Sequence, residues 1–249
     1  MKERARYPMD LTTKWHNRAI DRTSGNMFKL NDEQWCLYRS IINSTLYGHQ
    51  GPRLKYLNAQ AGTGKTFLAN YVAGTLRFHE KIVLSCAPSA RAAQSFMGGM
   101  TFHKCYECPI AHAFDRVVSL LTGTKHHSVV IQNAVLLIID ELPMLPANLL
   151  DALDQLLRDL MDCDEPFGGK HILACGDFRQ LPCIVPMGGR DAVISCSVIT
   201  HPTWPLWDRL MLFTLGTQAK WVMVPTKATC SCRMNFRRTS RSNQMLKLQ

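Results

Sequence analysis

The stretch LKYLNAQAGTGKT, residues 54–66, combines a short apolar run, a turn containing two glycines and a Lys-Thr pair. FLANYVAGTLRF follows with apolar residues at helical spacing, so the order is strand, glycine loop, helix. That order is typical of a phosphate-binding loop, in which glycines let backbone N–H groups face one concavity at a helix N-terminus. We therefore predict a nucleotide site made by Ala61, Gly62, Thr63, Gly64, Lys65 and Thr66.

Two side chains of this loop have specific predicted roles. Lys65 is expected to reach the β- and γ-phosphates, and the Thr66 hydroxyl is expected to hold Mg²⁺. The pattern GxxxxGK[ST] starts here with Ala59 instead of glycine. Alanine fits that position if its φ stays negative, so the prediction stands.

A second informative segment is AVLLIIDELPM, residues 134–144. Six consecutive apolar residues predict a strand buried on both faces, as in a parallel sheet. The strand ends in Asp140 and Glu141, at the edge where an α/β sheet presents its ligand site. Asp140 suits a Mg²⁺ ion, and Glu141 suits a base that orients attacking water.

Further segments complete an alternating pattern of strands and helices. KIVLSCAP (81–88) and HILACGDFRQLP (171–182) predict two more strands, the second followed by Gln180, a candidate γ-phosphate sensor. Residues 149–162 predict an amphipathic helix, and 111–133 are expected to be helical and then loose. Four strands alternating with helices predict an α/β fold with a parallel, RecA-like sheet flanked by helices.

The loop GGMTFHKCYECP, residues 98–109, allows several interpretations. Phe102, His103 and Lys104 interleave aromatic and basic side chains, which suits contact with the bases and phosphates of single-stranded nucleic acid. The alternative, a core phenylalanine and a structural histidine, is equally compatible with the sequence. A zinc site at His103, Cys105, Cys108 and His112 has weak support, because only one CxxC pair is present.

The bulk composition limits the classes of protein. The chain has 249 residues, 46% of them hydrophobic, which suits a packed core, and it has no apolar run long enough to cross a bilayer. Ten scattered cysteines and no signal peptide predict an intracellular protein with reduced thiols. The net charge of +10 is concentrated at the two ends, because residues 1–30 carry +4 and residues 216–249 carry +7. Such ends suit a polyanionic partner or solvated tails, and charge alone does not decide between them.

Taken in order, these motifs resemble the Pif-type DNA helicases of superfamily one, and in particular the helicase part of Helitron transposons. The resemblance rests on LNDEQ (30–34), AQAGTGKT (59–66), APSARAA (87–93), GGMTFH (98–103), IIDELPM (138–144) and PFGGKHILACGDFRQLP (166–182). It implies ATP-driven 5′-to-3′ translocation on single-stranded DNA, with Mg²⁺, in repair, recombination, telomere maintenance or transposition. By matching position, it implies that Gln34 reads adenine, that Asp140 and Glu141 are the Walker B pair, and that Gln180 couples the γ-phosphate to motion. Ser89, His103 and Lys104 are placed along the DNA path.

The chain departs from the family pattern after LMLFTL (210–215), where a γ-phosphate arginine is expected. GTQAKWVMVPTKATCS (216–231) intervenes before CRMNFRR. Deleting it restores the family order, so we hypothesise that 216–231 is an insertion, such as a retained intron. Arg237 is then the displaced catalytic arginine.

The expected organisation is a loose basic lead-in (1–28), a RecA-like ATPase domain (29–215) and an irregular basic tail (216–249). The resemblance implies a second RecA-like domain in a full-length form, which this sequence lacks. We expect no membrane association and an intracellular location, in the nucleus or alternatively in the mitochondrion. The competing interpretation is a non-catalytic, nucleotide- or DNA-binding remnant of a mobile element; a nucleotide kinase is a more distant alternative.

Overall fold

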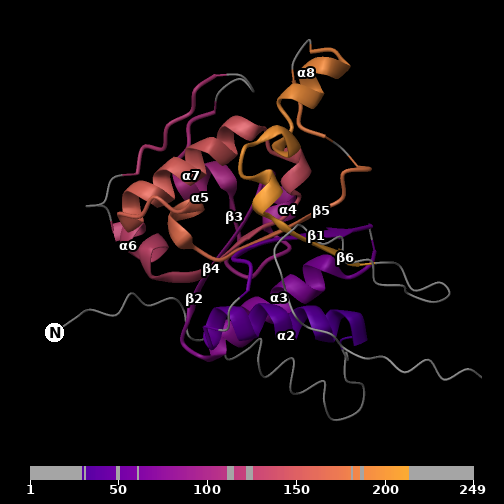
Figure 1. Ribbon diagram of the computed structural model, residues 1–249, viewed down its shortest axis with the longest axis vertical. Coiled ribbons are helices and arrows are strands. Elements are labelled where there is room, and N and C mark those ends of the chain that lie inside the picture. The colour runs from indigo at the N-terminus through magenta and orange to yellow at the C-terminus, as the bar shows by residue number, and fades with distance from the viewer. Residues whose placement is uncertain are drawn as a thin grey trace, which may run out of the picture.

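Six parallel strands form one sheet with the order β3-β2-β4-β5-β1-β6 (Figure 1). The computed structural model describes residues 30, 32–48, 51–60, 62–110, 115–121, 126–180, 182–185 and 188–212. The strands are β1 (Leu54–Ala59), β2 (Ile82–Ala87), β3 (Met100–Thr101), β4 (Ala134–Ile139), β5 (Ile172–Gly176) and β6 (Asp208–Leu212).

Helices connect successive strands, as parallel pairing requires. The α-helices are α2 (Asp32–Leu46), α3 (Lys65–Phe78), α4 (Ala90–Ala93), α5 (Phe102–Tyr106), α6 (His126–Asn133), α7 (Ala147–Met161) and α8 (Arg190–Ser195). Short 3₁₀ turns are η2 (Leu142–Met144), η3 (Pro166–Gly169), η4 (Val198–Thr200) and η5 (Trp204–Leu206). Among the described residues, no helix is both long enough and apolar enough to cross a bilayer.

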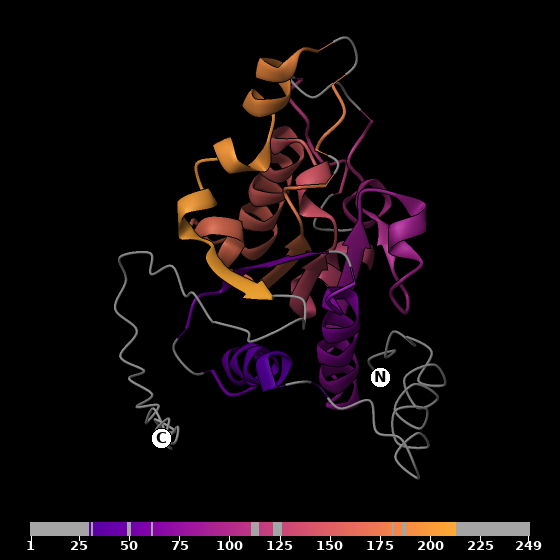
Figure 2. The same ribbon diagram turned by 90° about the vertical axis from the view of Figure 1, so that its right-hand side faces the viewer.

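The sheet separates two hydrophobic cores, because successive residues of a strand point to opposite faces. In β4, Leu137 and Ile139 pack with α5, α6 and α7, whereas Leu136 and Ile138 pack with α2 and α3. Figure 2 shows α2 and α3 together on one side of the sheet. Each core holds its helices against one face, so the ends of the central strands are fixed in position.

Most of the predicted elements are confirmed, with two corrections. The sheet has six strands and not four, because β3 and β6 pair at its two edges. Within residues 111–133, the described helix α6 lies at the C-terminal end of the range. Residues 115–121 form an irregular segment, and its Val117 and Leu121 pack into the hydrophobic core that also contains α7. In α2, Trp35 is 46% exposed and stacks on Tyr38.

Candidate nucleotide site

The predicted phosphate loop connects β1 to α3. Gly62 and Gly64 have φ of 80° and 85°, left-handed values that glycine adopts without steric cost. Gly64 is the N-cap of α3, and Lys65, the first residue of the helix, is only 7% exposed. Ala59 closes β1 in an extended conformation, so its replacement of glycine does not disturb the turn. Ala61 lies outside the described residues.

Gln34 contacts this loop from α2. Its Nε2 donates to the Thr63 carbonyl oxygen over 3.2 Å, and the side chain is buried. A Cβ at Gly64 would lie 2.7 Å from the same Nε2. The Gln34 side chain therefore packs directly against the loop and leaves no space for a side chain at position 64. Its role as a reader of adenine stays a prediction.

The acidic pair follows β4, as the sequence predicted. Asp140 is 3% exposed, and its Oδ2 accepts a hydrogen bond from the Thr66 hydroxyl over 3.4 Å. Glu141 has a left-handed backbone, with φ of 50°, and its Oε1 lies 3.7 Å from Lys65 Nζ. Four predicted residues from two motifs 74 positions apart thus form one cluster.

Burial and a neighbouring acid dominate the electrostatics of this cluster. Burial and, to a lesser extent, the nearby charge of Glu141 raise the pKa of Asp140 to about 6. The Glu141 backbone N–H, Lys65 and Thr66 act in the opposite direction. A bound cation would favour the charged carboxylate, because opposite charge stabilises the ionised form. The Thr66 hydroxyl and the Asp140 carboxylate are oxygen ligands of the kind that Mg²⁺ prefers, so these residues fit the ion.

The polar cluster after β5 is organised by Asp177. Arg179 Nε and Nη2 donate to the two Asp177 carboxylate oxygens over 2.8 and 3.2 Å, and these bonds lower the pKa of Asp177. Gln180 Nε2 lies 3.4 Å from Asp177 Oδ2, and Gln180 itself is exposed. β5 lies between β4 and β1, so this loop starts between the acidic pair and the phosphate loop. A role for Gln180 in sensing the γ-phosphate stays a prediction.

An aromatic cluster behind the loop was missed by sequence analysis. Phe178 packs against Tyr56 and Trp204, with ring centroids 5.4 and 5.5 Å apart. Tyr56 and Trp204 are in turn 5.2 Å apart. These rings hold the backbone between Asp177 and Arg179. Tyr56, Phe178 and Trp204 are far apart in the sequence, so no local periodicity predicts that they form a cluster.

The four residues predicted to contact DNA have different environments. Phe102 is fully buried in the sheet core and its ring packs against Tyr106, which supports the alternative interpretation of a core phenylalanine. Lys104 is exposed, and His103 is partly buried with its Nδ1 3.1 Å from the Cys108 carbonyl oxygen. The Ser89 hydroxyl caps α4 by accepting from Ala92 N.

The zinc alternative has no support in the described residues. Cys105 and Cys108 are buried, and among the residues with described positions no three His, Cys, Asp or Glu side chains form a metal-binding group. His112, together with Arg237 and the hypothesised insertion 216–231, lies outside the described part of the chain.

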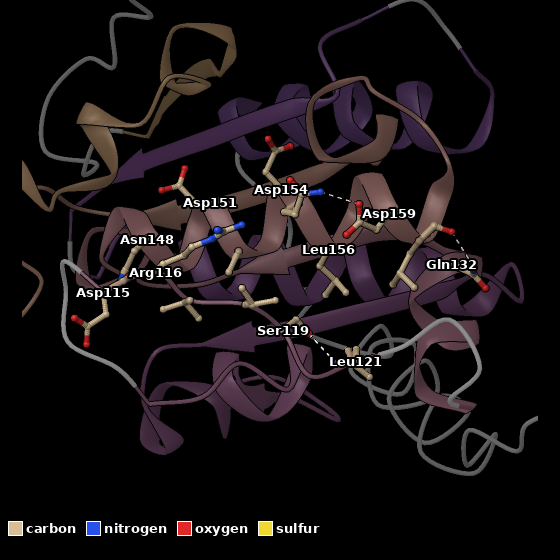
Figure 3. A pocket seen from close by; sticks show the side chains of 15 residues that line it. Asp115, Arg116, Ser119, Leu121, Gln132, Asn148, Asp151, Asp154, Leu156 and Asp159 are labelled. Atoms are coloured by element: carbon tan, nitrogen blue, oxygen red, sulfur yellow. Dashed lines mark hydrogen bonds between the residues drawn. The ribbon is translucent and has the colours of Figure 1, made fainter.

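A pocket lies along α7 (Figure 3). It has a volume of about 720 Å³ and shares no lining residue with the phosphate loop, the acidic pair or the Asp177 cluster. Asp115, Asp151, Asp154 and Asp159 line it. Asp154 binds Arg158, Asp151 lies 2.7 Å from His201, and Asp159 accepts a hydrogen bond from Gln155 over 2.7 Å.

Comparison with known proteins gives one consistent family. The family described as PIF1-like helicase matches residues 29–230. An ATP-dependent DNA helicase PIF1 of Trypanosoma brucei brucei is 33% identical over 156 residues, which are 62% of this chain and 15% of that protein. The ATP-dependent DNA helicase Pif1 of a Psychrobacter species is 35% identical over 136 residues, 54% of this chain and 20% of that protein.

The solved structures agree on the fold. Bacteroides Pif1 bound to single-stranded DNA superposes with a TM-score of 0.61 at 23% identity, covering 78% of this chain and 44% of that chain. Pif1 helicase from Candida albicans gives a TM-score of 0.60 at 24% identity, with 76% and 41% covered. The chain thus spans about a fifth or less of the curated relatives described above, and less than half of the solved chains.

Proposed function

Because the chain belongs to the PIF1-like helicase family, we propose that it is the ATP-binding motor domain of a DNA helicase. One observation carries the proposal. Thr66 and Asp140 approach to 3.4 Å, and Lys65 and Glu141 to 3.7 Å, between the N-terminus of α3 and the residues that follow β4. A triphosphate needs these groups at the same place: a phosphate-binding lysine, an oxygen pair for a cation and a second carboxylate.

The residues of the site would divide the work of hydrolysis between them. The backbone N–H groups of 62–66 and the Lys65 ammonium bind and orient the phosphates of ATP. Thr66 and Asp140 would hold Mg²⁺, which supplies charge neutralisation at the β- and γ-phosphates. Glu141 accepts a proton from the attacking water, and its left-handed backbone turns it toward Lys65. Gln34 supports the loop, and we propose that it also selects adenine.

We propose that the nucleic acid partner is single-stranded DNA, and that the motor translocates along it in the 5′-to-3′ direction. Lys104 is exposed and His103 partly so, both just beyond the edge strand β3. Arg91 is exposed on α4, the helix that Ser89 caps. A basic surface of this kind binds phosphates without reading sequence. The Bacteroides Pif1 structure contains single-stranded DNA bound to that protein, which supports the choice.

The experiment that tests the nucleotide site measures equilibrium binding of ATP with Mg²⁺ to the 249-residue chain. We expect Lys65→Ala to weaken binding at least about tenfold, since a charge-assisted phosphate contact is lost. Lys81→Ala is the matched control, because Lys81 is exposed just before β2. Equal binding by both variants would contradict the proposed site.

A second measurement separates the motor domain from a non-catalytic remnant. We expect hydrolysis of ATP, abolished in Glu141→Gln while ATP binding is kept. Lys104→Ala should weaken binding of single-stranded DNA and lower its salt dependence by about one ion, with Lys81→Ala again unchanged. Binding of both ligands without any hydrolysis would favour the remnant.

A further inference from the structure

Cys183 and Cys196 form a thiol pair that the nucleotide site does not use. Cys183 lies in the segment 182–185, shortly after Gln180, and Cys196 is the C-cap of α8. Their Sγ atoms are 2.7 Å apart, and each residue is 2% exposed. The two residues are separated by 13 positions in the sequence.

The pair is the centre of a small core of its own. Val185 and Val193 pack against the two cysteines, and this cluster is separate from the two cores of the sheet. No residue of α8 itself is buried. In Figure 1, α8 projects at the upper edge of the molecule. The segment therefore depends on the two cysteines for its buried contacts within the described residues.

The distance between the two sulfur atoms exceeds the disulfide bond length of about 2.0 Å by less than an ångström. We propose that Cys183 and Cys196 are a modification site, at which an oxidant of the peroxide class joins the two thiols in an intramolecular disulfide. The inference concerns this pair alone, and it holds whether or not the nucleotide site hydrolyses ATP.

Atoms and electrons balance over two steps. The sulfur of one cysteine attacks the O–O bond of the peroxide, which gives a sulfenic acid and one water molecule. The second thiol attacks the sulfenic sulfur, the S–S bond forms, and the hydroxyl leaves as a second water with the proton of that thiol. Two electrons pass from the two sulfur atoms to the peroxide. A dithiol reductant reverses the reaction by thiol–disulfide exchange.

Two features of the site set the rate. Burial raises the pKa of Cys183 to about 12, so its thiol is protonated at neutral pH and reacts slowly. The reaction should therefore accelerate as the pH rises. It also requires local opening, since each cysteine is 2% exposed. Once formed, the bond ties the segment after Gln180 to the end of α8.

The sequence provides a direct test. Trypsin cleaves after Arg179, Arg190 and Arg209, and the resulting peptides 180–190 and 191–209 contain one cysteine each. The folded 249-residue protein is treated with hydrogen peroxide, its remaining thiols are alkylated, and the digest is measured by mass spectrometry without reductant. We expect a linked 180–190/191–209 peptide, lighter than the two parts by two hydrogen atoms, which disappears on reduction.

Controls fix the interpretation. Cys36→Ser removes an exposed cysteine elsewhere and should leave the linked peptide unchanged, whereas Cys183→Ser or Cys196→Ser should abolish it. Protein unfolded in urea should give mixed pairings of its cysteines instead. If the wild-type digest contains only separately alkylated or over-oxidised peptides, or Cys183 joined to a different cysteine, the two residues are merely small buried hydrophobic side chains and the proposal is wrong.

Discussion

At the scale of single residues, the phosphate loop requires glycine at position 64 for two reasons, its backbone conformation and the space beside it. Gly64 has φ of 85°, and a Cβ there would meet the Gln34 side chain. We predict that Gly64→Ala lowers the free energy of unfolding by about 1 to 2 kcal/mol through its backbone alone. It should also displace Gln34 and weaken ATP binding at least about tenfold.

Gly48→Ala is the matched control for this prediction. Gly48 also has a left-handed backbone, with φ of 63°, but a Cβ there meets nothing within 4 Å. Chemical denaturation and ATP titration of both variants separate the two effects. Equal ATP affinities for Gly64→Ala and Gly48→Ala would show that the contact with Gln34 has no part in binding.

His171 provides a pH-dependent prediction at the same scale. Burial, together with the positive charges of Lys55, Arg53 and Lys170, lowers its pKa from 6.5 to about 4. The unfolded chain binds a proton near pH 6.5, whereas the folded protein does not until about pH 4, so this group removes stability as the pH falls between these values. His171→Gln should therefore lose less stability than wild type between pH 7 and pH 4.5 in urea unfolding.

The control for that measurement is His79→Gln, since His79 is exposed at the end of α3. It should follow the wild-type pH dependence. A His171→Gln protein with the same loss of stability on acidification as wild type would exclude His171 as a contributor.

At the scale of elements, the turn that carries Glu141 packs directly on β5. A Cβ at Gly176, the last residue of β5, would overlap the Pro143 ring in η2. We predict that Gly176→Ala destabilises the fold by about 1 to 3 kcal/mol by overpacking. It should also reduce ATP hydrolysis, because η2 begins immediately after Glu141.

Gly189→Ala is the control here, as a Cβ at Gly189 meets nothing within 4 Å. Thermal unfolding and steady-state hydrolysis of the two variants give the comparison. If Gly176→Ala were as stable and as active as Gly189→Ala, η2 would not transmit packing changes to the acidic pair.

The elements also explain which parts of the fold and of the site could be predicted from the sequence. Lys65, Thr66, Asp140 and Glu141 could be predicted because each is joined to a strong strand pattern whose end fixes its position. β3 could not, since two residues carry no periodicity. The burial of Phe102 depends on packing between α5 and the sheet, and an aromatic next to His103 and Lys104 reads equally well as a DNA contact. The Cys183–Cys196 contact is set by the fold of a loop, for which no sequence period exists.

At the scale of the whole molecule, the described residues form one RecA-like sheet. Helicases of this kind move by opening and closing a cleft between two such domains around ATP. We predict that the 249-residue chain binds ATP and hydrolyses it slowly, but does not unwind duplex DNA. Strand-displacement and ATPase assays, each with and without single-stranded DNA, test this. Robust DNA-stimulated turnover accompanied by unwinding would refute it. The intracellular, nuclear location stays a prediction.

The order of the sheet has a consequence for how the site communicates. β5 is hydrogen-bonded to β4 on one side and to β1 on the other. A small advance or retreat of this one strand would shift Asp177 relative to both the acids and the phosphate loop at once. A shift of β5 would therefore change both halves of the site together, and the backbone would carry that shift into the chain that follows β5.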